Sequence, residues 1–164
     1  MLMLEWRRFK APGHVDCLIV ASDAGIRAIE FHGQPEAASP EGRSNPLLRQ
    51  AVDQLRAYFA GELRDFDLAL DMQGTAFQKR VWQELRNIPY GRTRSYSFVA
   101  EAIGDRKAVR AVGAANGRNP IPIVVPCHRV IGAGGSLVGY GGGLPLKRFL
   151  LDLETRHGQL FQDA

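Results

Sequence analysis

A cysteine followed directly by a histidine, Cys127-His128, is the strongest candidate for chemistry in this sequence of 164 residues. The pair comes after Pro126, inside an apolar run from Ile121 to Ile131 that is typical of a buried strand. Because proline donates no hydrogen bond to a neighbouring strand, we expect the strand to break here and to expose the residues that follow in a constrained geometry. The thiolate is the nucleophilic form of cysteine, and an adjacent base increases its population. The pattern therefore predicts a reactive thiol at Cys127 with His128 as its base.

A base of this kind works best when a third group orients the imidazole ring. A carboxylate bonded to the histidine fixes its tautomer and stabilises the imidazolium that forms. Glu154, in the helix predicted near the end of the chain, is the first candidate, and Asp152 is the second. The residues alone leave this choice open.

The elements of the first half predict a small α/β domain. Apolar and polar residues alternate over 4–33 around turn-forming breaks, which is typical of a small antiparallel sheet. A capping asparagine, a first-turn proline and apolar residues at helical spacing predict a helix over about 45–61, and a short strand-like stretch follows at 66–70. The pattern then changes, so we expect two domains, 1–74 and 75–164.

Cys17 is the other cysteine of the chain, and it lies in an apolar run of this first half. Free cysteine packs as a small hydrophobic residue, so Cys17 is predicted to be a buried structural thiol. His14 and His32 could complete a metal site with it, but three loosely spaced ligands are a weak signal. We therefore expect neither a metal nor a cofactor.

The second half opens with a helix and continues with a pair of shorter ones. Thr75 and Gln78 form the pattern of a capping box at the start of the first helix. Two shorter helices are predicted over 95–103 and 107–116, joined by a tight turn that contains Gly104. This arrangement is typical of a DNA-binding helix-turn-helix, and an ordinary helical hairpin fits it equally well.

In the second helix of this pair, Arg110 is the one long side chain among a group of small ones. The small residues are Ala108, Ala111, Gly113, Ala114 and Ala115. Helices that read the major groove usually carry several polar side chains that reach base edges, and this helix has none of that kind. Small residues instead let a backbone approach DNA closely, while a single arginine can enter the base stack. Tight helix packing with a surface arginine is the alternative.

Positive charge is concentrated in the same half of the chain. The formal net charge is +4, with eight Lys or Arg and eleven Asp or Glu over 1–74 but thirteen and six over 75–164. Of the 21 basic residues, 17 are arginines, whose forked guanidinium suits contacts with phosphate and nucleic acid. The second half is therefore expected to meet a polyanion.

The chain start and the cysteine count indicate a cytoplasmic protein. The first apolar residues run directly into Glu5, Arg7 and Arg8, unlike a secretory signal, and no run approaches the roughly 20 apolar residues of a membrane span. Two cysteines are too few for a disulfide framework. We expect both thiols to be reduced and the protein to make no membrane contact.

The segment from Pro126 to Val130 resembles the active-site segment of the O6-alkylguanine-DNA alkyltransferases, also called methylated-DNA–protein-cysteine methyltransferases. The resemblance extends from about Thr75 to Glu154. Its further motifs are Ile88-Pro89-Tyr90-Gly91, Ser95-Tyr96, Lys107 to Gly113, Asn119-Pro120, and Gly139 to Gly143 followed by Lys147. The first half of the chain fits this family more loosely.

This resemblance implies an α+β protein of the α/β class. Its N-terminal domain would hold the small antiparallel sheet and a helix, and its mainly helical C-terminal domain would hold the helix-turn-helix and the active-site strand or loop. The implied partner is double-stranded DNA containing O6-alkylguanine, with O4-alkylthymine as a second candidate. The protein would bind the minor groove, flip the damaged base out and accept its alkyl group on Cys127, irreversibly and once per molecule. We expect a monomer in solution, with cooperative binding along DNA left open.

The family match also implies catalytic roles. Cys127 is the nucleophile, His128 removes its proton through a water, and Glu154 orients His128. Tyr96 gives a proton to N3 of the leaving guanine, and Asn119 supports the turn between the second short helix and the active-site strand. A core aromatic and a helix stop are the structural alternatives for Tyr96 and Asn119.

Other matched residues are implied to bind the base and the duplex. Backbone groups of Cys127 and Val130 would hold the exocyclic amine, and the Tyr140-Gly141 turn would cover the ring within a segment that has seven glycines between positions 132 and 143. Lys147 is matched to the same pocket, with a solvated surface charge as its alternative. The residues expected to contact DNA are Ser95, Arg110, Ala111, Gly113, Ala114 and Arg129, with Arg110 filling the space of the flipped base.

Two positions depart from the family pattern, and two other functions compete with alkyl transfer. Arg92 stands where relatives commonly carry an acidic residue, and Gly141 stands where some carry serine. A non-catalytic protein that only binds alkyl lesions is the first alternative, although in such relatives the reactive cysteine is replaced. A cysteine hydrolase is the second, and it gives no reason for the basic half.

Overall fold

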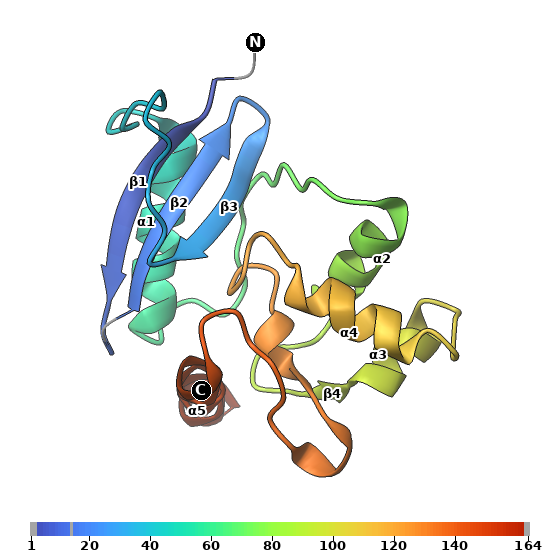
Figure 1. The fold of residues 1–164 in the computed structure, drawn as a ribbon. Helices are drawn as coiled ribbons and strands as arrows, with labels where there is room; N and C mark the ends of the chain where they lie inside the picture. Colours follow the sequence, from blue (N-terminus) through green and yellow to red (C-terminus); the bar gives the residue numbers. More distant parts are fainter. Residues whose placement is uncertain (1–2, 14, 163–164) are drawn as a thin grey trace. The chain divides into compact units, whose positions relative to one another are not determined.

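The computed structural model describes residues 3–13 and 15–162. The chain divides into two compact units, residues 1–73 and 74–164. Each unit is described by itself below, and the helices and strands carry the labels of Figure 1.

The first unit is a three-stranded antiparallel sheet with one helix against it (Figure 1). Its strands, in spatial order, are β1 (Glu5–Ala11), β2 (Val15–Ser22) and β3 (Gly25–Phe31), and the helix is α1 (Pro46–Phe59). Asn45 caps α1, because its side chain accepts hydrogen bonds from the first amides of the helix. The buried face of α1 consists of Leu48, Ala51, Val52, Leu55, Tyr58 and Phe59.

Cys17 lies on β2, paired with Phe9 of β1, and is fully buried. The prediction that Cys17 is buried is therefore confirmed, and burial and the neighbouring Asp16 raise the pKa of its thiol to about 12. His14 lies outside the described residues, and His32 is exposed. Over 3–13 and 15–162 no group of three or more His, Cys, Asp or Glu side chains is arranged to hold a metal ion.

The strand predicted over 66–70 is wrong in extent. Only Leu70 pairs, in a single bridge to Ile26, flanked by hydrogen bonds from Ile26 N to Ala69 O and from Asp71 N to Ile26 O. The chain passes close to Gly25 here, where a Cβ atom would lie 2.6 Å from the Ala69 oxygen. The segment therefore makes a local contact with the first residues of β3 and does not form a fourth strand.

The second unit is mainly helical. Its helices are α2 (Ala76–Leu85), α3 (Tyr96–Ala102), α4 (Val109–Gly117) and α5 (Leu144–Gln162), and its short parallel strands are β4 (Arg94–Ser95) and β5 (Val130–Ile131). The capping box at the start of α2 is confirmed, with both reciprocal hydrogen bonds present. Trp82 of α2 donates from its ring nitrogen to Ala115 O of α4 over 2.8 Å. The mixed α/β class, with a helix pair in the second half, is thus confirmed.

The strand predicted over 121–131 is mostly an irregular buried segment. All residues from Ile121 to Val130 are buried, but only Val130 and Ile131 form a strand. The backbone turns sharply at Ile123, whose φ of 74° is uncommon for a β-branched residue. Prolines at 120, 122 and 126 remove the amide donors that a continuous strand needs, so hydrophobicity decides burial here without deciding secondary structure.

Within the described part of the chain, no helix is both long and apolar enough to cross a membrane.

Candidate active site

Cys127 begins a short 3-10 turn, η1 (Cys127–Arg129), directly after Pro126. The turn is closed by hydrogen bonds from Cys127 N to Val125 O at 2.8 Å and from Arg129 N to Pro126 O at 3.0 Å. Cys127 is 4% exposed. The bend expected at Pro126 is therefore present. The expected exposure of the residues that follow it is wrong, because the apolar segment around the turn buries both Cys127 and His128.

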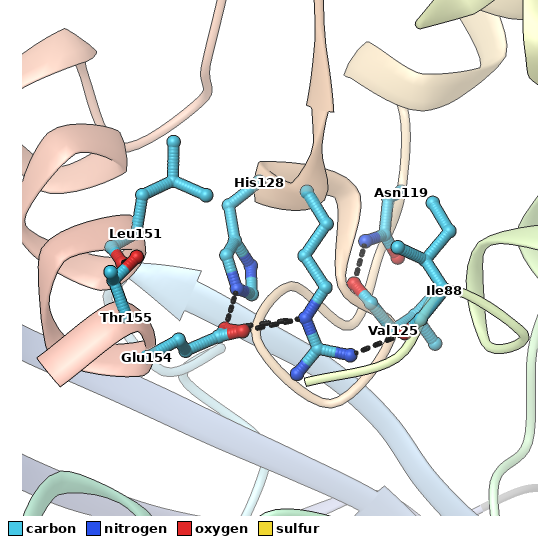
Figure 2. A network of polar contacts seen from close by, with 8 residues as sticks. Ile88, Asn119, Val125, His128, Leu151, Glu154 and Thr155 are labelled. Carbon is cyan, nitrogen blue, oxygen red and sulfur yellow. Dashed lines mark hydrogen bonds and ion pairs between the residues drawn. The ribbon is translucent and has the colours of Figure 1, made fainter. Parts of the chain in front are cut away.

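His128 and Glu154 form a buried pair between η1 and α5. Their side chains meet at 2.6 Å between Nε2 and Oε2, as Figure 2 shows. Asp152, the other carboxylate that the sequence left open, is exposed. The second ring nitrogen of His128, Nδ1, is buried and makes no hydrogen bond to the described residues. With Nε2 committed to Glu154, Nδ1 is the nitrogen that can take a proton.

Arg129 does not offer its side chain to DNA as predicted, because it is 5% exposed. Its Nε donates to Oε1 of Glu154 at 2.6 Å and to Oε2 at 3.2 Å, and its Nη1 donates to Ile88 O at 2.7 Å. Glu154 is thus held by both His128 and Arg129. The guanidinium belongs to the support of the carboxylate rather than to the DNA surface.

The charges of this cluster follow from its burial and pairing. Burial alone would raise the pKa of Glu154, but the charges and hydrogen bonds of His128 and Arg129 lower it to about 2. Burial lowers the pKa of His128 below its ordinary value, although Glu154 opposes this change. At neutral pH the carboxylate is therefore ionised and the imidazole is neutral, which is the form that can act as a base.

The thiol of Cys127 is held in its protonated form at rest. Burial raises its pKa to about 11, while a hydrogen bond from the Asn119 side chain and the charge of Lys147 act in the opposite direction. Nucleophilic attack from such a group requires removal of the proton during the reaction. His128 is the neighbouring base that could remove this proton.

Asn119 ties the end of α4 to the segment that leads to the thiol. Its Nδ2 donates to Val125 O at 2.7 Å, as drawn in Figure 2, and its Oδ1 accepts from Ile121 N at 3.0 Å. Asn116, which the sequence did not single out, donates from Nδ2 to Cys127 O at 3.4 Å. A side chain that acts on a backbone carbonyl leaves no signature in the sequence.

Tyr96 and Lys147 meet at one backbone oxygen of the glycine-rich segment. The Lys147 ammonium is fully buried and donates to Val130 O at 2.7 Å and to Val138 O at 2.9 Å, so it is not a solvated surface charge. The Tyr96 hydroxyl donates to the same Val138 oxygen at 3.5 Å. Burial and the charge of Cys127 both raise the pKa of Tyr96. Both residues therefore lie within electrostatic range of the thiol.

The residues matched to DNA contact lie on the helix pair. Arg110, Ala111 and Ala114 are exposed on α4. Gly113 is half-buried, and a Cβ atom there would lie 3.9 Å from the Tyr96 ring. Ser95 caps α3, since its hydroxyl accepts from Phe98 N at 3.0 Å. The exposed part of α4 thus combines small side chains with one arginine.

Tyr140 and Gly141, matched to the cover of the base, lie in the segment between η2 (Ala133–Gly135) and α5. Tyr140 is half-buried and Gly141 is exposed. Gly134, Gly135 and Gly139 have positive φ. At these three positions the backbone has a conformation that residues other than glycine rarely adopt.

Comparison with known proteins shows which family the chain belongs to. Residues 16–72 and 76–156 match the ribonuclease-like domain and the DNA binding domain of 6-O-methylguanine DNA methyltransferase. A methylated-DNA–protein-cysteine methyltransferase of Mycolicibacterium paratuberculosis is 66% identical over 158 residues, which are 94% of each chain. The chain belongs to this family. A further methylated-DNA–protein-cysteine methyltransferase, from Methanosarcina acetivorans, is 51% identical over 84% of this chain and 90% of its own.

Solved structures of the family share the fold. The crystal structure of the O6-methylguanine methyltransferase of Mycobacterium tuberculosis matches with a TM-score of 0.83 and 46% identity, covering 97% of this chain and 99% of that one. The structure of Mycobacterium tuberculosis OGT in complex with DNA matches with a TM-score of 0.84 and 47% identity, covering 93% and 94%. The family expected from the sequence motifs is confirmed.

Proposed function

We propose that this chain repairs DNA by moving the alkyl group of O6-alkylguanine in duplex DNA onto the sulfur of Cys127. The observation that carries the proposal is the buried thiol in the same turn as His128, whose ring is fixed by Glu154 at 2.6 Å. The high-identity relatives are named for transfer from methylated DNA to a protein cysteine, which is the same reaction class.

In this mechanism His128 takes the thiol proton through a water as the S–C bond forms and the C–O6 bond breaks. Tyr96 supplies a proton to N3 of the departing guanine, so that the base leaves neutral. The thiol proton held by His128 returns to Tyr96 through solvent and completes the proton balance. The alkyl group stays on sulfur as a thioether, and each molecule therefore reacts once.

The remaining residues are proposed to hold the substrate. Lys147 keeps Val138 in place beside Tyr96, and the Tyr140-Gly141 turn covers the flipped base. The small residues of α4 approach the minor groove, and Arg110 occupies the gap left by the base. A relative solved in complex with DNA supports the duplex as partner.

The non-catalytic alternative and the chemical proposal predict different masses. The protein is incubated with a duplex containing O6-methylguanine, and intact mass and a peptide map are recorded. We expect one methyl group on Cys127, none in Cys127→Ser, and full reaction in the matched Cys17→Ser variant. Tight binding of the lesion with an unmodified Cys127 would overturn alkyl transfer and support the non-catalytic lesion-binding function. Catalytic turnover would indicate a hydrolase.

The role of Arg110 has its own test. Arg110→Ala should slow transfer from duplex DNA by at least about tenfold while leaving transfer from free O6-benzylguanine nearly unchanged, because only the duplex must be opened. Equal losses on the two substrates would remove the base-flipping role.

We also propose that the protein works as a monomer in the cytoplasm, with O4-alkylthymine as a second substrate. Both cysteines are free thiols, which suits a reducing compartment. A sedimentation experiment and a competition between O6-methylguanine and O4-methylthymine duplexes test the first and last of these points.

A further inference from the structure

An arginine and an exposed aromatic ring are stacked where β4 runs into α3. The Cζ atom of Arg94 lies 5.0 Å from the centroid of the Phe98 ring. Phe98 is 49% exposed, an unusual environment for a large aromatic side chain. Arg94 precedes Ser95, and the Ser95 hydroxyl accepts from Phe98 N, so the cap of α3 holds the two residues together. We call this the Arg94–Phe98 pair.

The guanidinium of the pair has no acidic partner among the described residues. No ion pair there joins Arg94 to a carboxylate, and its Nη1 donates to the neighbouring Thr93 O at 3.0 Å. Residues 92–98 contain two arginines and no acidic residue. The Phe98 ring thus orients the Arg94 guanidinium, whose charge no nearby carboxylate neutralises. The ring itself exposes apolar surface to solvent.

The pair lies beside the helix that carries the proposed DNA contacts. Tyr96 begins α3 and contacts the position of Gly113 on α4, while Val99 and Ala100 form the buried face of α3. Phe98 follows Tyr96 by two positions, which is roughly 200° around a helix, so it points away from that buried face. Phe98 therefore lies on the solvent-exposed side of α3, the helix that packs against α4.

Nucleic acid has the chemistry that matches both members of such a pair. A guanidinium forms forked hydrogen bonds with phosphate oxygens, and an aromatic ring packs on sugars and on base faces. The excess of basic over acidic residues in the second half favours a polyanion over an apolar protein surface.

We propose that the Arg94–Phe98 pair is a second contact with duplex DNA beside α4, in which Arg94 binds a backbone phosphate and Phe98 packs on the adjacent sugar. This inference rests on the proposed function, because it places the same duplex on a wider surface. The pair adds affinity and takes no part in the chemistry at Cys127.

Duplex affinity measured by fluorescence anisotropy over a range of salt concentrations tests the proposal. Phe98→Ala should weaken binding roughly fivefold or more, and Phe98→Tyr should restore most of the affinity because it keeps the ring. Arg94→Gln should weaken binding and also reduce the slope of log K against log salt by about 0.9, the value of one phosphate contact. Arg49→Gln, which removes the same charge from the exposed side of α1, should change neither quantity. Circular dichroism checks that each variant is folded.

Two results separate this inference from the proposed function. If the unmodified protein methylates Cys127 from duplex DNA while Phe98→Ala and Arg94→Gln bind as tightly as it does, the pair is not a DNA contact and the repair function stands. A change of oligomeric state in Phe98→Ala at unchanged duplex affinity would likewise overturn the inference, in favour of a protein partner. Failure of the unmodified protein to accept a methyl group would instead overturn the repair function.

Discussion

Asn116, near the end of α4, donates a hydrogen bond from Nδ2 to the main-chain oxygen of Cys127 over 3.4 Å. Asn116 is 5% exposed, and its Oδ1 has no hydrogen-bond partner in the described chain. Trp82 donates to the preceding carbonyl, that of Ala115. The helix that carries Arg110 is therefore bonded directly to the backbone of the nucleophile.

Removal of this bond should affect both stability and reaction. Asn116→Ala leaves the buried Cys127 oxygen without this donor, and we expect the free energy of unfolding to fall by roughly 1–3 kcal/mol. Transfer at saturating duplex should slow while the duplex Kd stays unchanged. Urea unfolding and single-turnover kinetics measure the two effects. Asn87→Ala, at an exposed position of the same unit, should stay within about 0.5 kcal/mol. An equal, negligible change in both variants would contradict the link.

Because of the ion pairs of Glu154, the free energy of unfolding should fall as the pH becomes acidic. Its folded pKa of about 2 lies below its ordinary value, so its contribution is complete above the unfolded pKa and is lost as pH falls toward 2. Glu154→Gln should cost roughly 3 kcal/mol near pH 7, because it leaves the buried Arg129 charge unpaired, and should flatten the loss between about pH 5 and about pH 3. Urea titrations over this range measure both effects. Asp152→Asn, an exposed carboxylate on the same helix, should behave as the unmodified protein.

The raised pKa of Cys127 should appear in its reactivity. With Cys17→Ala removing the other thiol, the rate of alkylation by iodoacetamide should rise about tenfold per pH unit from about pH 7 to about pH 10, because the pKa is about 11. An unperturbed cysteine would level off above about pH 8.5. Mass spectrometry of quenched samples follows the reaction, and a plateau near neutral pH would show that the thiolate is already formed at rest.

The alkylated product should be less stable than the free protein. Cys127 is 4% exposed, so an added methyl group enters a packed interior at a cost of about 1–3 kcal/mol. For a chain of this length each kcal/mol lowers the Tm by roughly 2–4 °C. Differential scanning calorimetry before and after reaction with O6-methylguanine duplex measures the change, and Cys127→Ser carried through the same treatment is the control. An unchanged Tm would show that the site has room for the group.

Position 141 should accept a side chain that position 139 does not. A Cβ atom at Gly141 meets nothing within 4 Å, and its φ is not in the left-handed region, whereas Gly139 has a φ of 44°. Gly141→Ser should therefore keep its stability within about 0.5 kcal/mol and change the ratio of benzyl to methyl transfer rates. Gly139→Ser should lose roughly 1 kcal/mol or more. Thermal unfolding and rates with the two free bases measure these outcomes.

Local patterns in the sequence were sufficient for several parts of the structure. The capping box of Thr75 and Gln78, the Asn45 cap and the burial of Cys17 follow from a few neighbouring residues, and each was predicted. The bend at Pro126 follows from the chemistry of proline alone. These features depend on short-range geometry, which the order of residues determines.

Features that depend on distant partners were not predictable in this way. The family match implied that Arg129 contacts DNA, but its guanidinium is buried and bonded to Glu154 on α5 and to Ile88 O. The carbonyl oxygens of Val138 and Cys127 accept bonds from Lys147 and Asn116, and every residue has such an oxygen. The sequence therefore identifies reactive side chains better than the backbone groups that hold them.

The backbone oxygen of Val138 accepts hydrogen bonds from both Lys147 and Tyr96, which bears on how the substrate range can change. In the glycine-rich segment, nothing lies within 4 Å of a Cβ atom at Gly134, Gly135, Gly139 or Gly141. Side chains at these glycines would meet no packed neighbour, so we expect changes there to alter the proposed cover of the base. Lys147 also donates to Val130 O, directly after the turn that holds the thiol, so a change at Lys147 would affect the cover and the nucleophile together.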